Sequence, residues 1–266
     1  MSKLTKEQHE VLLSNPHLGT LSCQLRETLV SLGRLRSHHA GEQLHRCGAP
    51  PSGFSIIVEG AVRLCAASLT GEEAVLAIYA PGQWYGEVPS LDGQLSTYDI
   101  YAHEKTTVLN IALDDFRQLC AEYPEFVVFL LLGVFAQLRT MWLVFEAYIT
   151  IPVNGLIAGR LLELAQSFGF QTAEGLRIEI RLTLATLAQM VGATRQRVWQ
   201  VLKAFERAGL IRQESSQITL LDKRGIERLA IGYPLPARMS VPKIKASAKN
   251  LLKLQTIRTR EVQACI

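Results

Sequence analysis

The chain has 266 residues, of which 48% are hydrophobic and 20% charged, and its formal net charge is +4. This length is enough for two compact domains, each with a core of its own. The sequence contains five scattered cysteines: Cys23, Cys47, Cys65, Cys120 and Cys265. Because none belongs to a CxxC pair or to a Cys/His cluster at metal-ligand spacing, they argue against a zinc or iron–sulfur site, and their odd number fits reduced thiols in a cytoplasm. The N-terminus, MSKLTKEQHE, is polar and has no apolar signal core, so we expect a cytoplasmic protein.

Residues 36–113 have the pattern of an antiparallel β domain. Two short helices are expected before them, over residues 5–14 and 23–32, with Asn15 and Pro16 between them. Short apolar runs then alternate with turn residues, over residues 55–58, 62–65, 74–79, 98–101 and 107–111. Several short strands at regular spacing are typical of an antiparallel sandwich or jelly roll.

Residues 124–150 predict a long, largely apolar helix. Apolar residues recur at alternating steps of four and three, the spacing of a helix that packs against a partner helix. The series is Val127, Leu131, Val134, Leu138, Met141, Phe145 and Tyr148. We therefore expect the β domain and a second copy of the chain to bury this helix on several sides. A membrane span is the alternative, but the unbroken apolar run 126–136 is shorter than the ~20 residues needed, and Gln137, Arg139 and Glu146 interrupt the rest of the helix.

A helix break is predicted at residues 151–155. Pro152 lacks a backbone donor and favours an extended conformation at Ile151, and Asn154 is expected to cap the next helix, over residues 156–168. This break is the expected hinge between the two halves of the chain.

Residues 183–211 carry the pattern of two short helices around a tight turn. Gly192 is expected to supply the turn, Thr194 to cap the second helix and Gly209 to come just after its end. The predicted buried faces are Leu184, Leu187, Ala188 and Val191 on the first helix, and Val198, Val201, Leu202 and Phe205 on the second. An alternating strand over 176–182 precedes them, and a hairpin formed by 210–211 and 217–220 comes after them. This order predicts a winged helix-turn-helix, whose second helix enters the major groove of DNA.

The outward side of the second helix offers groups that suit DNA. They are Thr194, Arg195, Gln196, Arg197, Trp199, Gln200 and Lys203. A guanidinium at Arg195 matches guanine O6 and N7, and the amides of Gln196 and Gln200 match adenine N6 and N7. We expect Thr194, Arg197 and Lys203 to hold phosphates, and Trp199 to flank the groove or pack on the wing. A solvated face of an ordinary helical bundle is the alternative for this pattern.

Three stretches resemble the Crp/Fnr family of bacterial transcription regulators. TRQRVWQVLKAFERAGLI resembles the family's DNA-binding signature, and GEQLHRCGAPPSGFSIIVEGAVRL and APGQWYGEV resemble its cyclic-nucleotide-binding sensor domain. The resemblance covers about residues 20–232 and implies an α+β chain with an antiparallel β jelly-roll sensor domain, a long dimerisation helix and a C-terminal winged helix-turn-helix. It implies a homodimer that binds a palindromic site on double-stranded DNA, and it makes RNA polymerase a candidate partner. It also places Arg195 at a base-reading position, where cyclic-AMP-binding members continue with a Glu and an Arg in place of Gln196 and Gln200.

The resemblance also shows where the sensor departs from cyclic-AMP binders. Those members hold the cyclic phosphate in a cassette that begins Gly-Glu and ends with Arg and then Ser or Thr. This chain keeps Gly86 and Glu87, but Ser96, with Thr97 after it, stands where the Arg is expected. A buried phosphate needs an opposite charge, so the change argues against cyclic AMP. His103 and Lys105 are expected further along the same strand, in the wrong register to replace the Arg.

The base end of the expected effector pocket departs as well. Two adjacent hydroxyl residues face adenine in cyclic-AMP binders, and the equivalent pair here is Met141 and Trp142. We expect an apolar or aromatic effector or none, its identity unknown, with packing in a core or dimer as the alternative role for this pair.

The sequence shows no nucleophile elbow, paired metal histidines or phosphate-binding glycine loop, so we expect neither catalytic residues nor a bound metal or cofactor. His38, His39, His45 and Cys47 lie close together but match no haem motif, and a surface location is expected for the histidines.

The expected organisation has four parts. Residues 1–123 form the sensor domain, 124–151 the dimerisation helix, 152–232 the winged helix-turn-helix and 233–266 a basic, disordered tail. Residues 234–266 hold seven Lys or Arg and one Glu, a charge of +6, which leaves −2 for the rest of the chain. A DNA-binding arm is the alternative for the tail. At the level of function, a binding module that attaches to DNA without sequence preference is the alternative to a sequence-specific regulator.

Overall fold

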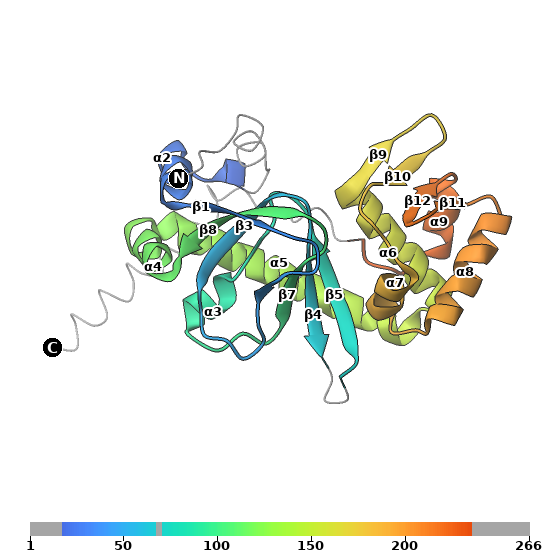
Figure 1. The fold of residues 1–266 in the computed structure, drawn as a ribbon, viewed down its shortest axis with the longest axis horizontal. Helices are drawn as coiled ribbons and strands as arrows, with labels where there is room; N and C mark the ends of the chain where they lie inside the picture. The colour runs from blue at the N-terminus through green and yellow to red at the C-terminus, as the bar shows by residue number, and fades with distance from the viewer. Residues whose placement is uncertain (1–17, 68–70, 236–266) are drawn as a thin grey trace, which may run out of the picture.

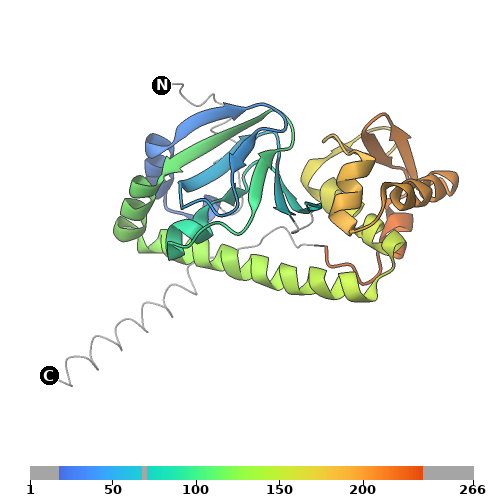
Figure 2. The ribbon, with the colours of Figure 1, turned by 60° about the horizontal axis from the view of Figure 1, so that its bottom comes forward.

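The computed structural model of the chain describes residues 18–67 and 71–235. The helix expected over residues 5–14 and the basic tail beyond residue 235 lie outside the described residues. Figure 1 shows an N-terminal β domain and a smaller C-terminal helical domain, and Figure 2 shows the long helix α5 running along one side of the molecule from the first to the second.

The N-terminal domain is an antiparallel β structure of two four-stranded sheets. One sheet has the order β1 (Arg34–His38), β8 (Thr106–Ala112), β3 (Gly53–Glu59) and β6 (Trp84–Tyr85). The other has the order β2 (Gln43–His45), β7 (Asp99–Ala102), β4 (Val62–Ala67) and β5 (Glu73–Tyr79). The expected strands are present, and the sequence did not predict β1, β2 and β6, which are short or largely polar. The expectation of an antiparallel jelly roll is confirmed.

Helices close one end of this domain around an aromatic core. They are the 3₁₀ helix η1 (Leu18–Thr20), α2 (Cys23–Leu32), α3 (Glu87–Asp92) and α4 (Leu113–Glu122). Phe54 of β3, Trp84 of β6 and Phe116 of α4 are at most 2% exposed. The first turns of α5 (Pro124–Thr150) complete the core, because Phe126 and Phe129 are fully buried and the Trp84 and Phe129 ring centroids lie 4.8 Å apart. The β domain therefore anchors the start of α5.

The C-terminal domain is a winged helix-turn-helix. Its helices are α6 (Val153–Phe168), α7 (Leu184–Val191), α8 (Arg195–Arg207) and α9 (Lys223–Leu229). Its four-stranded antiparallel sheet has the order β11 (Ile211–Glu214), β12 (Gln217–Leu220), β10 (Leu176–Ile178) and β9 (Gly169–Gln171). The predicted wing hairpin is β11–β12, whereas β9 and α9 were not predicted.

Three local expectations need correction. Asn154 does not cap α6: Pro152 is the N-cap residue, with φ −67° and ψ 157°, and its carbonyl accepts from Leu156 N at 3.1 Å, so the helix starts at Val153. The strand expected over 176–182 ends at Ile178 because Leu182 N donates to the Ser216 carbonyl in the wing turn, although the inward alternation continues. Tyr233, expected at the start of the tail, is only 7% exposed and packs in the core of the C-terminal domain.

Candidate nucleic-acid interface and effector site

The turn between α7 and α8 forms as the sequence predicts. Gly192 comes directly after α7 in the left-handed region, with φ 62° and ψ 36°, a conformation that glycine adopts without steric cost. The Thr194 side chain accepts from Arg197 N at 3.2 Å and so caps the start of α8. Gly209, with φ 68°, lies just after the end of α8. These residues fix where α8, the predicted recognition helix, begins and ends.

The faces of α8 are also those predicted. Val198, Val201, Leu202 and Phe205 are all buried, at 6% exposure or less. The opposite side is exposed over Thr194, Arg195, Gln196, Arg197, Trp199 and Gln200. Lys203 is half-buried and donates to Glu206 Oε2 at 2.6 Å, an interaction that lowers the pKa of Glu206. The charge of Lys203 is therefore already paired within α8, while the first turn of the helix presents its side chains to solvent.

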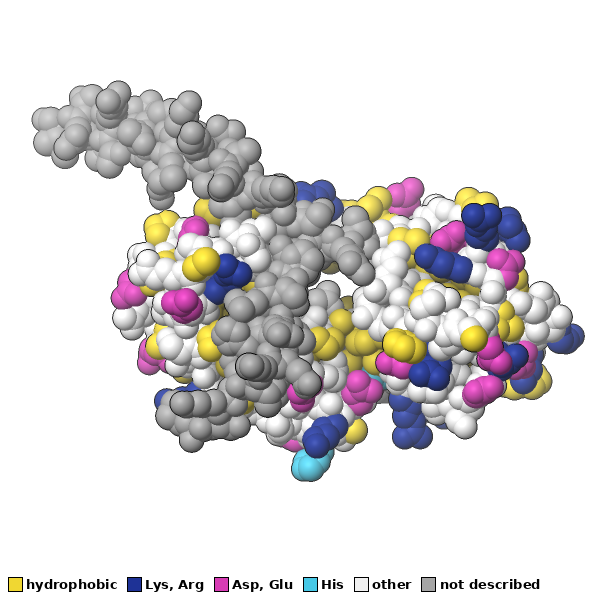
Figure 3. Space-filling model, turned by 90° about the horizontal axis from the view of Figure 1, so that it is seen from above, with side chains coloured by type: hydrophobic (Ala, Val, Ile, Leu, Met, Phe, Trp, Pro, Cys, Tyr) yellow, Lys and Arg dark blue, Asp and Glu magenta, His cyan; other side chains and the backbone are white. Residues whose placement is uncertain are grey.

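The wing is less basic than the recognition helix. Arg212 of β11 forms an ion pair with Glu174, and Glu214 stands beside the wing turn at Ser215. In Figure 3, Lys and Arg side chains are mixed with acidic ones over the C-terminal domain. Arg195 and Arg197, in the first turn of α8, are exposed and form no ion pair with a described residue, so both are available to phosphate.

At the expected effector site, Glu87 is buried and lacks a full set of partners. Gly86, with φ 89°, turns the chain so that Glu87 begins α3, and the Glu87 side chain is 2% exposed. Burial raises the pKa of Glu87 to about 7, opposed by hydrogen bonds from its own backbone and from the Gln137 side chain of α5. Its Oε2 atom has no hydrogen-bond partner among the described residues. No cation is among the groups that shift this pKa, so only these two hydrogen bonds oppose the effect of burial.

The other expected effector residues differ in their exposure. Ser96 is 5% exposed and its hydroxyl donates to the Tyr98 carbonyl at 2.9 Å, whereas Thr97 is exposed. Met141 and Trp142 are 57% and 62% exposed on the surface of α5. Tyr98 lies close enough to Glu87 for the carboxylate to raise its pKa, after burial, to about 12.

His103 and Lys105 are not on the strand expected for them. They lie in the turn between β7 and β8, where His103 Nε2 donates to the Arg181 carbonyl of the C-terminal domain at 2.8 Å. Of the histidines near Cys47, His38 contacts Glu42 Oε1 at 2.6 Å. Within residues 18–67 and 71–235, no group of three or more His, Cys, Asp or Glu side chains could hold a metal ion.

The two domains are joined by a buried polar cluster that the sequence did not reveal. Arg160 of α6 is 4% exposed, and its guanidinium donates to Glu163 Oε2 at 2.8 Å, to the Tyr148 hydroxyl of α5 at 3.2 Å and to the Leu76 carbonyl of β5 at 3.5 Å. The Tyr233 hydroxyl donates to the same Glu163 oxygen at 3.0 Å. A lone Arg and Glu within an apolar helical run were the available signal.

Further contacts extend this junction. Gln189 of α7 donates to Glu73 of β5 at 3.1 Å, and Val75 and Ile78 of β5 share one apolar core with α6 and α7. The β4–β5 hairpin is therefore packed directly against the C-terminal domain.

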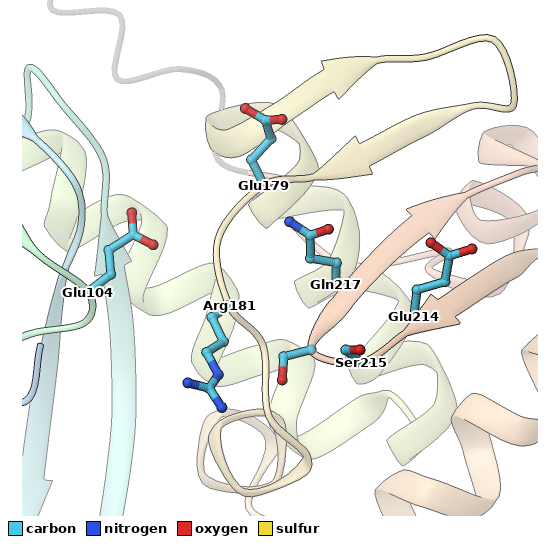
Figure 4. A pocket seen from close by; sticks show the side chains of 7 residues that line it. Glu104, Glu179, Arg181, Glu214, Ser215 and Gln217 are labelled. Atoms are coloured by element: carbon cyan, nitrogen blue, oxygen red, sulfur yellow. The ribbon is translucent and has the colours of Figure 1, made fainter.

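A cleft of about 520 Å³ lies at the same junction, on the side of the wing. Its lining residues are Glu104, Glu179, Arg181, Glu214, Ser215, Ser216 and Gln217. Figure 4 shows Glu104 on the β-domain side, Ser215 at the wing turn and Arg181 between them. Its lining holds three carboxylates and one guanidinium, and two of the carboxylates, Glu179 and Glu214, are paired with Arg177 and Arg212.

Comparison with known proteins agrees with this architecture. Residues 35–123 match the cyclic nucleotide-binding domain, and residues 157–229 match the Crp-like helix-turn-helix domain. The CRP-like cAMP-activated global transcriptional regulator of Mycobacterium tuberculosis is 31% identical over 183 residues, which cover 69% of this chain and 82% of that protein. The chain belongs to the Crp/Fnr family. It is a DNA-binding transcription regulator of the Crp/Fnr type.

Further relatives and solved structures share the same architecture. The cAMP-activated global transcriptional regulator CRP of Haemophilus influenzae is 26% identical over 227 residues, 84% of this chain and all of that protein. Among solved structures, the c-di-GMP responsive global regulator CLP of Xanthomonas campestris has a TM-score of 0.65 at 17% identity and covers 75% of this chain and 99% of that one. A CooA variant of Carboxydothermus hydrogenoformans has a TM-score of 0.62 at 21% identity, over 79% of this chain and 90% of that one. These two structural likenesses concern the fold.

Proposed function

We propose that the protein is a homodimer that reads a palindromic DNA site with two copies of α8, and that it does so without cyclic AMP. The observation that carries the proposal is the exposure of two surfaces of opposite character in one chain: the polar first turn of α8 and the apolar length of α5. The first has the chemistry of base and phosphate contacts, and the second that of a helix that packs on its own copy.

The roles on α8 are assigned from side-chain chemistry and from exposure. Arg195, in the first turn, donates in pairs to guanine O6 and N7, and Gln196 and Gln200, one turn apart on one face, pair with adenine N6 and N7. Thr194 and Arg197 contact phosphates at the helix start, where the backbone N–H groups add positive potential. Lys203 must give up its ion pair with Glu206 before it can contact a phosphate. We therefore assign Lys203 the smallest contribution to the affinity for DNA.

The dimer proposal rests on the apolar surface of α5. Its exposed large side chains are Leu131, Phe135, Leu138, Met141, Trp142, Leu143, Phe145, Tyr148 and Ile149. By length and composition this helix is one that could cross a membrane, with a mean hydropathy of 2.0 over an 18-residue window of which 17% is buried. An apolar surface of this size is expected to be buried against a protein partner or a membrane. The heptad positions Leu131, Leu138 and Phe145 lie within it, which favours a second copy of the same helix over lipid.

A substitution in this surface tests the dimer. Leu138→Glu places a charge in the seam and is expected to convert a dimer into a monomer in sedimentation experiments, because the carboxylate would be desolvated between two helices. Leu95→Glu, at a side chain that is 59% exposed in the β domain, is the matched control and should stay dimeric. A wild-type protein that is monomeric and co-sediments with phospholipid vesicles would contradict the dimer and support the membrane alternative.

The effector part of the proposal rests on the charge of the site. Ser96 stands at the cassette position of the phosphate-binding Arg, and the buried carboxyl of Glu87 has no cation beside it among the groups that perturb it. A cyclic phosphate placed there would meet a carboxylate without a counter-charge. We therefore propose that cyclic AMP is not the effector. The break at Ile151 and Pro152 is the proposed hinge through which any effector acts on α8, and RNA polymerase is the proposed further partner.

Selection of genomic DNA fragments by the purified protein, without added ligand, tests the proposed reading. We expect an enriched palindrome whose half-sites lie about 34 Å apart, one turn of the double helix. Arg195→Ala should relax the preference at one guanine per half-site and cost about 1–3 kcal/mol. Equal enrichment of all sequences would identify a module that binds DNA without reading it.

A further inference from the structure

Trp199 is the one large apolar side chain that α8 presents to solvent in the described structure. Its surface is 49% exposed, whereas Val198, Val201, Leu202 and Phe205 of the same helix are buried. The residues that pack on the core of the C-terminal domain do not include it, and within the described residues no aromatic ring is stacked on it. The side chain is therefore not part of that buried core, and packing on the wing stays a prediction.

The position of Trp199 on the helix is informative. At about 100° per residue, its side chain leaves the axis ~40° from Arg195 and ~60° from Gln196, one turn further along. It thus lies between the directions of Arg195 and Gln196, two of the three residues assigned to base reading. Arg195, Gln196 and Trp199 are all exposed, so the three side chains share the solvent-facing side of α8. A helix that enters the major groove by this face carries the indole into the groove with it.

We propose that Trp199 reads a thymine through its C5-methyl group, at a base pair next to the guanine contacted by Arg195. This inference rests on the proposed DNA reading by α8. The methyl group is the one apolar feature on the major-groove edge of the bases, and it distinguishes thymine from the other three. An uncharged indole gains little from phosphate, but it gains from burying apolar surface, and Trp is a frequent anchor of interfaces. The contact gives the recognition helix an apolar specificity element beside its guanidinium and amide groups.

Methyl deletion in the DNA provides the test. The site enriched from a random DNA pool by the wild-type protein is resynthesised with deoxyuridine in place of each thymine of one half-site in turn, and binding is measured for wild type, Trp199→Ala and Trp199→Phe. We expect one position at which loss of the methyl group weakens wild-type binding by about fourfold, the factor for losing one buried methyl-sized group. At that position Trp199→Ala should bind the two duplexes equally, and Trp199→Phe should keep part of the difference.

The outcomes separate this inference from the function on which it rests. If the wild-type protein enriches no DNA sequence, the proposed sequence-specific binding by α8 is refuted, and the thymine contact of Trp199 is refuted with it. If a site is enriched but no thymine in it is methyl-sensitive, or if Trp199→Ala keeps the full sensitivity, the thymine contact is refuted while sequence-specific binding stands. Circular dichroism and binding to poly(dI-dC) control for folding and for the phosphate contacts, and the deoxyuridine scan with the unmodified protein remains decisive if Trp199→Ala is poorly folded.

Discussion

Substitution of Glu87 by Gln should remove a large part of the pH dependence of stability. Burial raises the pKa of Glu87 from the ordinary 4.5 to about 7, whereas in the unfolded chain it returns to the ordinary value. The folded state therefore binds a proton that the unfolded state has released between these two pH values, and stability falls as pH rises through the interval. At about 1.4 kcal/mol per pKa unit, the shift corresponds to about 3 kcal/mol, most of it lost between pH 5 and pH 8.

Urea denaturation at pH 5, 6, 7 and 8 measures this effect. We expect wild type to lose about 2–3 kcal/mol relative to Glu87→Gln across the series, because the amide has nearly the shape of the carboxyl group and does not titrate. Tyr79 and Tyr98, whose pKa values the same carboxylate raises, stay protonated throughout. Glu27→Gln, at an exposed position of α2, is the matched control and should behave like wild type. If the free energy of unfolding changes with pH in the same way for wild type and Glu87→Gln, the carboxyl of Glu87 does not have the raised pKa that its burial implies.

Three further substitutions test the packing around the junction and the recognition helix. Arg160→Met should destabilise the protein to urea by about 3 kcal/mol, because Glu163 would keep a charge without its buried partner, and an undiminished midpoint would exclude the cluster as a structural tie. Gly159→Ala should lower the free energy of unfolding by about 1–3 kcal/mol, because the added Cβ would lie 2.1 Å from Cγ of Tyr233. Adding Tyr233→Ala to the same chain should relieve the clash. If the effects of the two substitutions are simply additive, the contact is contradicted. Thr194→Ala should lower thermal stability by about 1 kcal/mol through loss of the helix cap, while Thr194→Ser restores it.

The sequence predicted those features that depend on neighbouring residues. The faces of α8, the left-handed Gly192 and the Thr194 cap all result from side-chain spacing and local backbone chemistry, and all are present. The strands of the β domain were visible for the same reason, because each apolar run buries its residues against a nearby strand. Five of the seven residues in the apolar heptad series of α5 are exposed, and the other two, Val127 and Val134, are half-buried.

The features that were missed depend on distant parts of the chain. Strand β10 ends at Ile178 because Leu182 is held by the wing turn, a contact that alternation within 176–182 does not encode. Asn154 is a good capping residue, but Pro152, with its fixed φ, already occupies the N-cap position of α6. The preference of proline at the helix start thus outweighs the capping preference of asparagine. The Arg160 cluster joins α6 to Leu76 of β5 and to Tyr233, which are 84 and 70 residues away from their partners, and only the fold brings them together.

The sensor illustrates both situations. Counting along the cassette identifies Ser96 in place of the expected Arg, but the raised pKa of Glu87 and its contact with Gln137 of α5 require coordinates. The resemblance to cyclic-AMP binders assigned Met141 and Trp142 to an effector pocket, and their exposure on the surface of α5 likewise requires coordinates.

The affinity of the protein for its selected DNA site, with and without saturating cyclic AMP, tests the central claim most directly. The claim is that α8 recognises a specific DNA sequence and that the sensor domain cannot bind a cyclic phosphate beside Glu87. We therefore expect tight, sequence-specific binding that cyclic AMP leaves unchanged. Binding that appears only with cyclic AMP, or that strengthens severalfold with it, would contradict the claim.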